Sequence, residues 1–194
     1  MVINYLDSKR ISALSSDFAT TTSYNHIADT GDDFLNLHDT NRYAVMKILS
    51  GSPAIGTSVQ KIKISMRKVG TPAGTFKVGI WNASDVLVIS VTNTASSFLT
   101  TSYVDYEFDM GSATELLLDY KVGIEYLTGV GVSNRIDVET ISATTETGYS
   151  KGYPALNTGG VDLDILMSFD STPVTISKPT NVQDNSILVE KDTG

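Results

Sequence analysis

Carboxylates are the most abundant titratable side chains in this chain. The 194 residues include 22 Asp and Glu but only two histidines and no cysteine. A chain without cysteine has no disulfide, thiolate metal site or cysteine nucleophile. His26 and His38 both lie in a polar stretch ahead of the first strongly strand-like segment. We therefore expect hydrogen-bonded or solvated histidines, not the base of a serine triad.

Two pairs of acids have a spacing that suits a glycosidase. Asp105 with Glu107, and Asp162 with Asp164, are two residues apart and would share one face of a strand. Such a pair can supply the acid and the base for glycoside hydrolysis, which leaves a β-sandwich hydrolase as a third hypothesis. Acids in this pattern are ordinarily the solvent-facing residues of an antiparallel sheet. We favour that interpretation and expect no enzyme.

Calcium is the one ion for which the sequence offers ligands. Asp29-Thr30-Gly31-Asp32-Asp33 places three carboxylates around a glycine, and carboxylate oxygens suit a hard cation. The segment lacks the twelve-residue spacing and the final Glu of an EF-hand loop. Asp29, Asp32 and Asp33 are therefore candidate calcium ligands, with a solvated acidic turn as the favoured alternative. No other cofactor is expected.

Aromatic side chains offer a route to carbohydrate binding. Sugars stack on exposed aromatic rings, because C–H groups interact with the ring face. Trp81 follows Phe76-Lys77-Val78-Gly79-Ile80 on the face opposite Phe76, Val78 and Ile80, while Tyr149 and Tyr153 lie in a glycine-containing segment. Trp81, Tyr149 and Tyr153 are the candidate sugar-binding residues. The alternative that we favour for Trp81 is burial at the end of its strand.

Charge and hydropathy exclude several classes of function. The net charge of −8 and the pI near 4.6 oppose binding to a polyanion such as nucleic acid. No run approaches the ~18 apolar residues of a membrane-spanning helix. Asp7 interrupts the opening before an apolar h-region develops, so no secretory signal peptide is expected. The hydrophobic fraction of 41% is enough for a packed core.

Alternating apolar and polar residues predict strands along the middle of the chain, and no segment has a convincing helical period. The clearest case is Lys61 to Lys68, in which Ile62, Ile64 and Met66 share a face. Pro72 and two glycines follow before residues 76–81, which predicts a hairpin between these two segments. The eight expected strands are 43–49, 61–68, 76–81, 86–91, 103–108, 120–126, 136–141 and 163–169. This pattern predicts an all-β, antiparallel sandwich.

The two ends of the chain differ from its middle. Residues 1–42 are expected to form an arm partly packed on a sandwich of residues 43–170, and residues 171–194 an extended, strand-like tail. Both ends carry apolar residues with no obvious core to join, which makes them candidate assembly residues. They are Ile3, Tyr5 and Leu6 at one end and Ile187, Leu188 and Val189 at the other. Such a tail can add a strand to the sheet edge of a neighbouring subunit.

The strand and turn patterns also resemble a known group of proteins. Lys68-Val69-Gly70-Thr71-Pro72-Ala73-Gly74-Thr75-Phe76, together with Tyr106-Glu107-Phe108 and residues 120–126, is similar to jelly-roll sandwiches of the carbohydrate-binding-module type. Such domains occur in virion surface proteins of phages and archaeal viruses. Residues 3–11 and 178–194 are similar to the terminal segments of virion-associated proteins. The resemblance implies a jelly-roll fold and a place in a virion.

The sequence therefore supports two hypotheses of different kinds. The first is a non-enzymatic structural or decorating subunit, such as a capsid or tail accessory protein, of a virion or comparable extracellular assembly. Its partners would be copies of itself and other subunits, held through the terminal arms. The second is a carbohydrate-binding attachment module that recognises cell-surface glycans. A homo-oligomer favours the first hypothesis, and a monomer that binds glycans favours the second.

Overall fold

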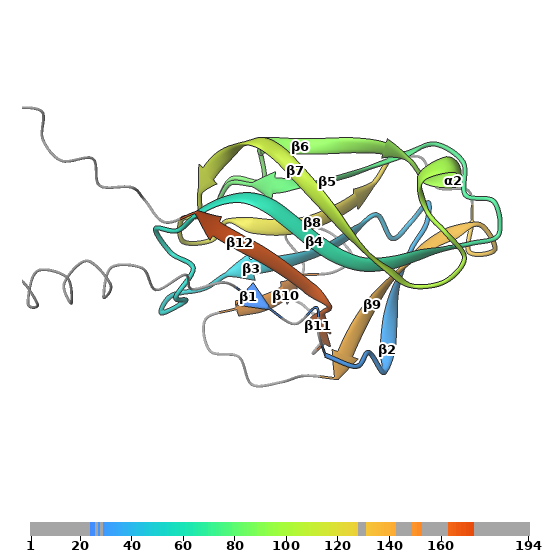
Figure 1. Ribbon diagram of the computed structural model, residues 1–194, viewed down its shortest axis with the longest axis horizontal. Coiled ribbons are helices and arrows are strands. Elements are labelled where there is room, and N and C mark those ends of the chain that lie inside the picture. The colour runs from blue at the N-terminus through green and yellow to red at the C-terminus, as the bar shows by residue number, and fades with distance from the viewer. Residues whose placement is uncertain are drawn as a thin grey trace, which may run out of the picture.

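The computed structural model describes residues 24–25, 27, 29–127, 131–142, 149–152 and 163–172. Within these residues the chain is mostly β-strand, arranged in two antiparallel sheets (Figure 1). The expectation of an all-β, sandwich-like chain is confirmed. The elements are β1 (Tyr24–Asn25), β2 (Asp33–Leu37), β3 (Tyr43–Ile48), β4 (Ser58–Val69), β5 (Thr75–Trp81), β6 (Leu87–Thr94), α2 (Ala95–Phe98), β7 (Val104–Glu115), β8 (Lys121–Tyr126), β9 (Arg135–Ser142), β10 (Tyr149–Gly152), β11 (Leu163–Ile165) and β12 (Met167–Thr172).

The strands divide between two sheets, which we name sheet A and sheet B. Sheet A follows the order β1-β12-β4-β9-β11, with β7 paired to β4 and β2 paired to β9. Sheet B follows the order β10-β3-β8-β5-β6. Most neighbours within a sheet come from distant parts of the sequence, such as β3 with β8 and β4 with β9. The two layers are therefore interleaved along the chain.

Sheet A is organised around β4 and a fork in its pairing. β12 pairs with β4 from Ser58 to Ile64, and β9 pairs with β4 from Met66 to Val69. The fork lies at Leu166, whose N–H donates to the carbonyl of Glu139 at 3.0 Å and whose carbonyl accepts from the N–H of Ser65 at 3.0 Å. On one side of Leu166 the chain is β11, paired with β9, and on the other it is β12, paired with β4.

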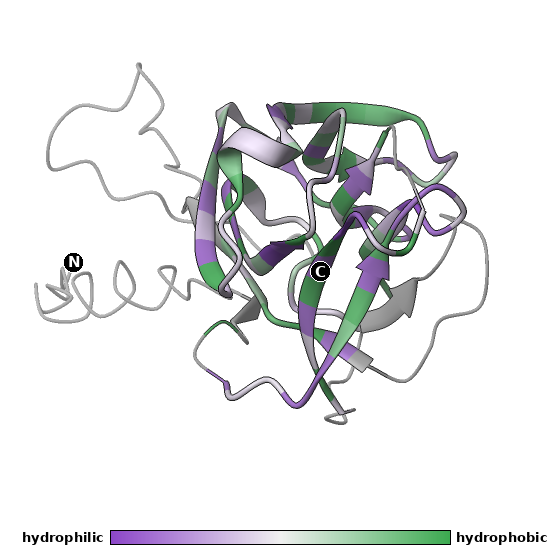
Figure 2. Ribbon diagram, turned by 90° about the vertical axis from the view of Figure 1, so that its right-hand side faces the viewer, coloured by the Kyte–Doolittle hydropathy of each residue, from purple (hydrophilic) through white to green (hydrophobic). Residues whose placement is uncertain are grey.

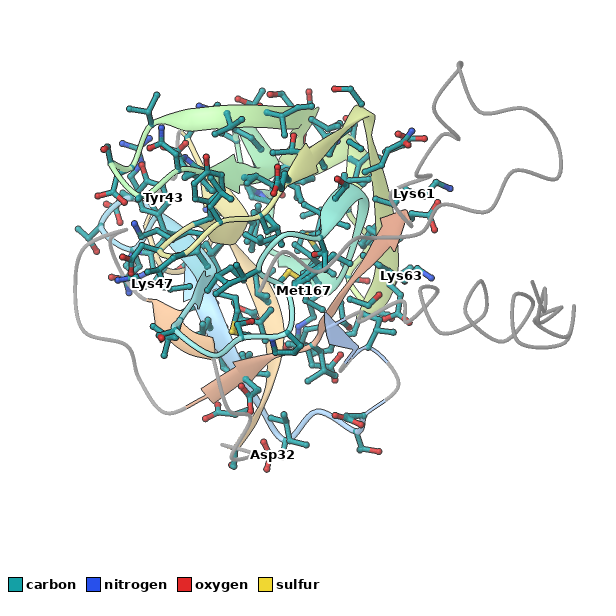
Figure 3. All side chains as sticks on the ribbon, turned by 90° about the vertical axis from the view of Figure 1, so that its left-hand side faces the viewer. Asp32, Tyr43, Lys47, Lys61, Lys63 and Met167 are labelled. Carbon is teal, nitrogen blue, oxygen red and sulfur yellow. The ribbon has the colours of Figure 1, made fainter. Side chains whose placement is uncertain are left out.

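The core fills the space between the two sheets. Ile62, Ile64 and Met66 point inward from β4, as the alternating pattern predicts, and they are fully buried. Phe76, Val78 and Ile80 from β5 face them from sheet B. In Figure 3, Tyr43 and Lys47 of sheet B and Lys61 and Lys63 of sheet A lie on opposite sides of the molecule, with Met167 between them. This arrangement places the basic side chains outside and the methionine in the core.

The predicted hairpin between residues 61–68 and 76–81 is wrong. The first segment is β4 of sheet A and the second is β5 of sheet B, and the two strands do not pair. The loop between them crosses from one layer to the other. Gly70 adopts a φ of +66°, and a Cβ there would lie 2.4 Å from the carbonyl oxygen of Ser133. Proline and glycine satisfy a crossing loop as well as a hairpin turn, so composition alone does not distinguish them.

Other segments also differ from the sequence-based expectation, three of them as follows. Residues 33–37, assigned to the arm, form β2 and pair with β9, with Leu35 and Leu37 buried. The strand expected at 103–108 continues to Glu115 as β7. The strand expected at 163–169 is two strands divided by Leu166. In each case tertiary pairing sets the bounds of the strand.

The crossing loop depends on a buried tyrosine. Tyr126 is fully buried, and its hydroxyl donates to the carbonyl of Ala73 at 2.6 Å. Burial also raises the pKa of Tyr126. The hydrogen bond therefore links the end of β8 to the loop between the two layers.

Replacing Tyr126 by Phe should lower the free energy of unfolding by about 1 kcal/mol, because the Ala73 carbonyl loses its donor while the ring still fills the core. Urea denaturation followed by Trp81 fluorescence measures the change. Tyr120→Phe is the matched control, since the Tyr120 hydroxyl has no hydrogen bond to the described residues. Equal stability of the two variants would contradict this role for the hydroxyl.

Candidate functional site

Trp81, the first of the sugar-binding candidates, is only 2% exposed. It pairs with Lys121 in the same unshifted register in which Gly79 pairs with Gly123. Its side chain therefore lies on the face of sheet B that points away from the core. Trp81 is therefore buried, as the favoured interpretation expects. The ring is buried without any change of face along β5. A ring covered to this extent offers no face on which a sugar could stack.

Glycines at the centre of sheet B make room for this ring. Gly79 and Gly123 are cross-strand partners. A Cβ on Gly123 would lie 2.2 Å from the carbonyl oxygen of Ala44, and one on Gly79 would lie 2.4 Å from that of Ile89. Because Gly123 has no side chain, Tyr43 and Trp81 meet across β8 with ring centroids 6.2 Å apart, edge to face. The rings of Tyr43 and Trp81 therefore pack against each other on the outer face of sheet B.

A layer of ion pairs covers the rest of this outer face. The Glu125 carboxylate accepts hydrogen bonds from Arg42 Nη2 at 3.0 Å and from the Tyr43 hydroxyl at 2.8 Å. Lys77 Nζ lies 3.2 Å from its other oxygen. The Glu125 side chain is 8% exposed, so its charge depends on these three partners. Burial and the neighbouring Glu125 raise the pKa of Tyr43 to about 12, which keeps the hydroxyl protonated as the donor.

Two further ion pairs of this face involve aspartates in strained turns. Asp85 and Asp119 have positive φ angles of 63° and 66°. The Asp85 carboxylate accepts a hydrogen bond from the buried Lys121 ammonium. Lys47 Nζ lies 2.6 Å from Oδ1 of the Asp119 carboxylate. Aspartate is one of the few residues that tolerates this conformation. The outer face of sheet B therefore has the character of a second, polar packing layer.

Glu125→Ala should lower the free energy of unfolding by about 3 kcal/mol, because it leaves Arg42 and Lys77 without their shared, largely buried partner. Chemical denaturation measures the loss. Glu107→Ala is the matched control on sheet A, where the carboxylate is exposed and pairs with Lys61 at 2.8 Å. The control should lose far less stability. Comparable losses in the two variants would show that Glu125 has no special structural role.

Tyr149 and Tyr153 are the remaining sugar-binding candidates. Tyr149 begins β10, whose backbone pairs with β3, while Tyr153 lies outside the described residues. We expected no Gly-x-Ser-x-Gly pattern of a hydrolase nucleophile elbow in the sequence, and this is wrong for the pattern itself, because Gly148-Tyr149-Ser150-Lys151-Gly152 matches it. Such an elbow is a sharp turn from strand to helix. Residues 149–152 are instead extended and paired with residues 45–48, which does not fit that motif.

The acidic turn does not bring its carboxylates into a metal site. Asp32 Oδ1 accepts a hydrogen bond from the N–H of Ser142 at 2.8 Å, and Asp33 Oδ1 accepts one from the N–H of Phe34. Asp29 is also described, and within the described ranges no group of three or more His, Cys, Asp or Glu is arranged to hold a metal ion. Asp32 and Asp33 fix the entry into β2. This geometry gives no support to calcium binding.

Of the acids considered for catalysis, Glu107 has a local partner, and so has the one described histidine, His38. Glu107 pairs with Lys61, whose hydrogen bond lowers the pKa of that carboxyl. Asp164 is buried in β11, and Asp162 lies outside the described residues. His38 is 7% exposed, with Nδ1 2.8 Å from Asp39 Oδ1 and 3.2 Å from Thr40 Oγ1. These contacts are typical of a turn between two strands.

A row of aromatic and charged residues crosses the outer face of sheet A. The buried Asp137 carboxylate accepts hydrogen bonds from Arg67 at 3.1 Å and Arg135 at 2.7 Å. Arg67 stacks on the ring of Tyr103 at 4.5 Å, and Arg135 lies 5.8 Å from the ring of Phe34. Burial raises the pKa of Tyr103 to about 12. We call Phe34, Arg135, Asp137, Arg67 and Tyr103 the sheet A row.

The open edge of sheet B is the surface that the sequence analysis missed. β6 pairs with β5 along one side, and it has no other strand partner in the described part of the chain. The sequence contains no charged residue between Asp85 and Asp105. Val86 and Val88 are 58% and 47% exposed. In Figure 2 this strand forms the top edge of the molecule and is largely green. The uncharged run was the signal that could have identified it.

The candidate assembly residues Ile3, Tyr5, Leu6, Ile187, Leu188 and Val189 lie outside the described residues.

Comparison with models of known protein families, with curated proteins and with solved structures found no match to this chain. No helix in the described ranges has the length and apolarity needed to cross a bilayer. Functional inference therefore rests on the geometry of the sandwich itself.

Proposed function

We propose that this chain is a non-enzymatic structural or decorating subunit of a virion or a comparable extracellular assembly. The proposal includes a jelly-roll arrangement of the two sheets, which is supported by the pairing of strands distant in sequence, such as β3 with β8. The resemblance of the strand and turn segments to virion surface domains supports the setting. In this role the chain works by association with other subunits.

The open β6 edge is the observation that carries the proposal. An exposed strand with unpaired backbone groups is a template for another chain, and proteins that stay monomeric block it with charge, proline or a covering segment. β7, the neighbouring strand of sheet A, carries Asp105, Glu107, Asp109 and Glu115. β6 has neither charge nor proline across its eight residues, and its pairing with β5 shifts at a β-bulge only at Val88, next to its first residue. An edge of this kind supports association, with the apolar residues of the terminal arms as a second means of contact.

The purified chain should have a mass in solution above its monomer mass of 20.9 kDa at micromolar concentration. Val88→Lys should lower the measured mass, because a charge on the edge opposes pairing. Val132→Lys is the matched control, since Val132 is 57% exposed in the loop before β9. Light scattering measures all three proteins. A wild-type chain that remains monomeric at every concentration would contradict the assembly function.

A carbohydrate-binding attachment module is the second candidate, and the sheet A row is the observation that favours it. Phe34 is 39% exposed beside Arg135, and sugar sites combine exposed rings with charged hydrogen-bonding groups. On a glycan array, Phe34→Ala should then remove the signal given by the wild-type chain. A wild-type chain that binds no glycan on the array would count against this candidate.

A further inference from the structure

We propose that the β6 edge binds the β6 edge of a second copy of this chain, antiparallel and about a two-fold axis, so that two sheets B become one continuous sheet. This inference rests on the proposed assembly function and names its partner. A two-fold axis makes the same surface serve on both subunits, which is the commonest symmetry of soluble oligomers.

The charge pattern is the first argument for a second copy as the occupant. When a strand pairs antiparallel with its own symmetry mate, the two copies of one strand face each other, so a strand whose charges are all of one sign brings like charges together, which is unfavourable across a strand pair. β6 contains no charged residue and therefore meets no such penalty. β7 lies along the same side of the molecule (Figure 1), and its four acids would oppose the same arrangement. The contrast identifies β6 as the edge suited to self-pairing.

The second argument is that the β6 edge is already ordered. β6 is held along its length by β5, from Thr94 opposite Thr75 to Leu87 opposite Trp81. Its inner side chains Ile89 and Val91 pack against the core. Pairing two preformed edges therefore costs little conformational entropy.

Other open edges in the described part of the chain fit this partner less well. β10 and β2 have only four and five residues, and β2 begins with Asp33. β6 has eight residues, enough for several pairs of backbone hydrogen bonds between the copies. Val86 and Val88, which are 58% and 47% exposed, would then be covered at the junction.

Single-cysteine variants test the pairing directly, because the wild-type chain has no cysteine. Ser90→Cys, Thr92→Cys and Thr94→Cys place one thiol at alternate positions on the outer side of β6, and Val88→Cys places one at the β-bulge near its start. Under mild oxidation we expect the yield of disulfide-linked dimers to be highest for one variant or for one mixture of two variants. In the single variant the cysteine lies at the two-fold axis, and in the mixture the two cysteines lie at equal distances on either side of the axis. Val132→Cys measures the background of random collisions. Non-reducing gel electrophoresis gives the yields.

The outcomes separate the inference from the function on which it rests. Yields in β6 no higher than that of Val132→Cys, in a chain that light scattering shows to be oligomeric, would overturn the β6 pairing and leave the assembly function standing. A β6 cysteine that cross-links to Leu188→Cys, and not to a second β6, would also overturn it, since the tail would then be the added strand. A chain that is monomeric throughout would overturn both.

Discussion

The sandwich depends on how a single residue, Leu166, divides two strands. Its carbonyl accepts from Ser65 of β4, and its N–H donates to Glu139 of β9. These two hydrogen bonds let one continuous segment join β9 on one side and β4 on the other. The Ser65 hydroxyl also bonds the Glu139 carboxylate, so the two strands are linked through side chains at the same level. Without this junction, β4 would lose the neighbour that covers half of its length.

Sheet B achieves stability by a different means. Its outer face is covered by ion pairs and two aromatic rings that pack above a pair of glycines. Every residue of β8 is buried, including Lys121 and Glu125. Buried charges of this kind are tolerated only because each has a close partner of opposite sign. The sheet is therefore packed on both sides over its centre, while no strand of the described residues pairs with β6 beyond β5.

Strand positions could be predicted from the sequence because alternation is a local property. The segments at 43–49, 76–81 and 120–126 became β3, β5 and β8 with shifts of one residue at their ends. Pairing could not be predicted in the same way. Pro72 and the adjacent glycines suit a crossing between layers as well as a hairpin. The exposure of Trp81 depended on Tyr43, which is distant in sequence. The β6 edge could be recognised only after pairing had shown which strands lie at the margins.

The junction at Leu166 also bears on how the protein is made. β4 is synthesised early, yet Ile64 finds its partner in Met167, near the end of the described chain. Pairing between such distant segments is slow, because a long loop must close before any contact forms. A nascent chain that has emerged only as far as β9 therefore leaves the side of β4 from Ser58 to Ile64 without its β12 partner. Ribosome pausing, premature release or crowding by sister chains at that stage would favour misassembly, and a chaperone that holds β4 until β12 emerges would protect the yield.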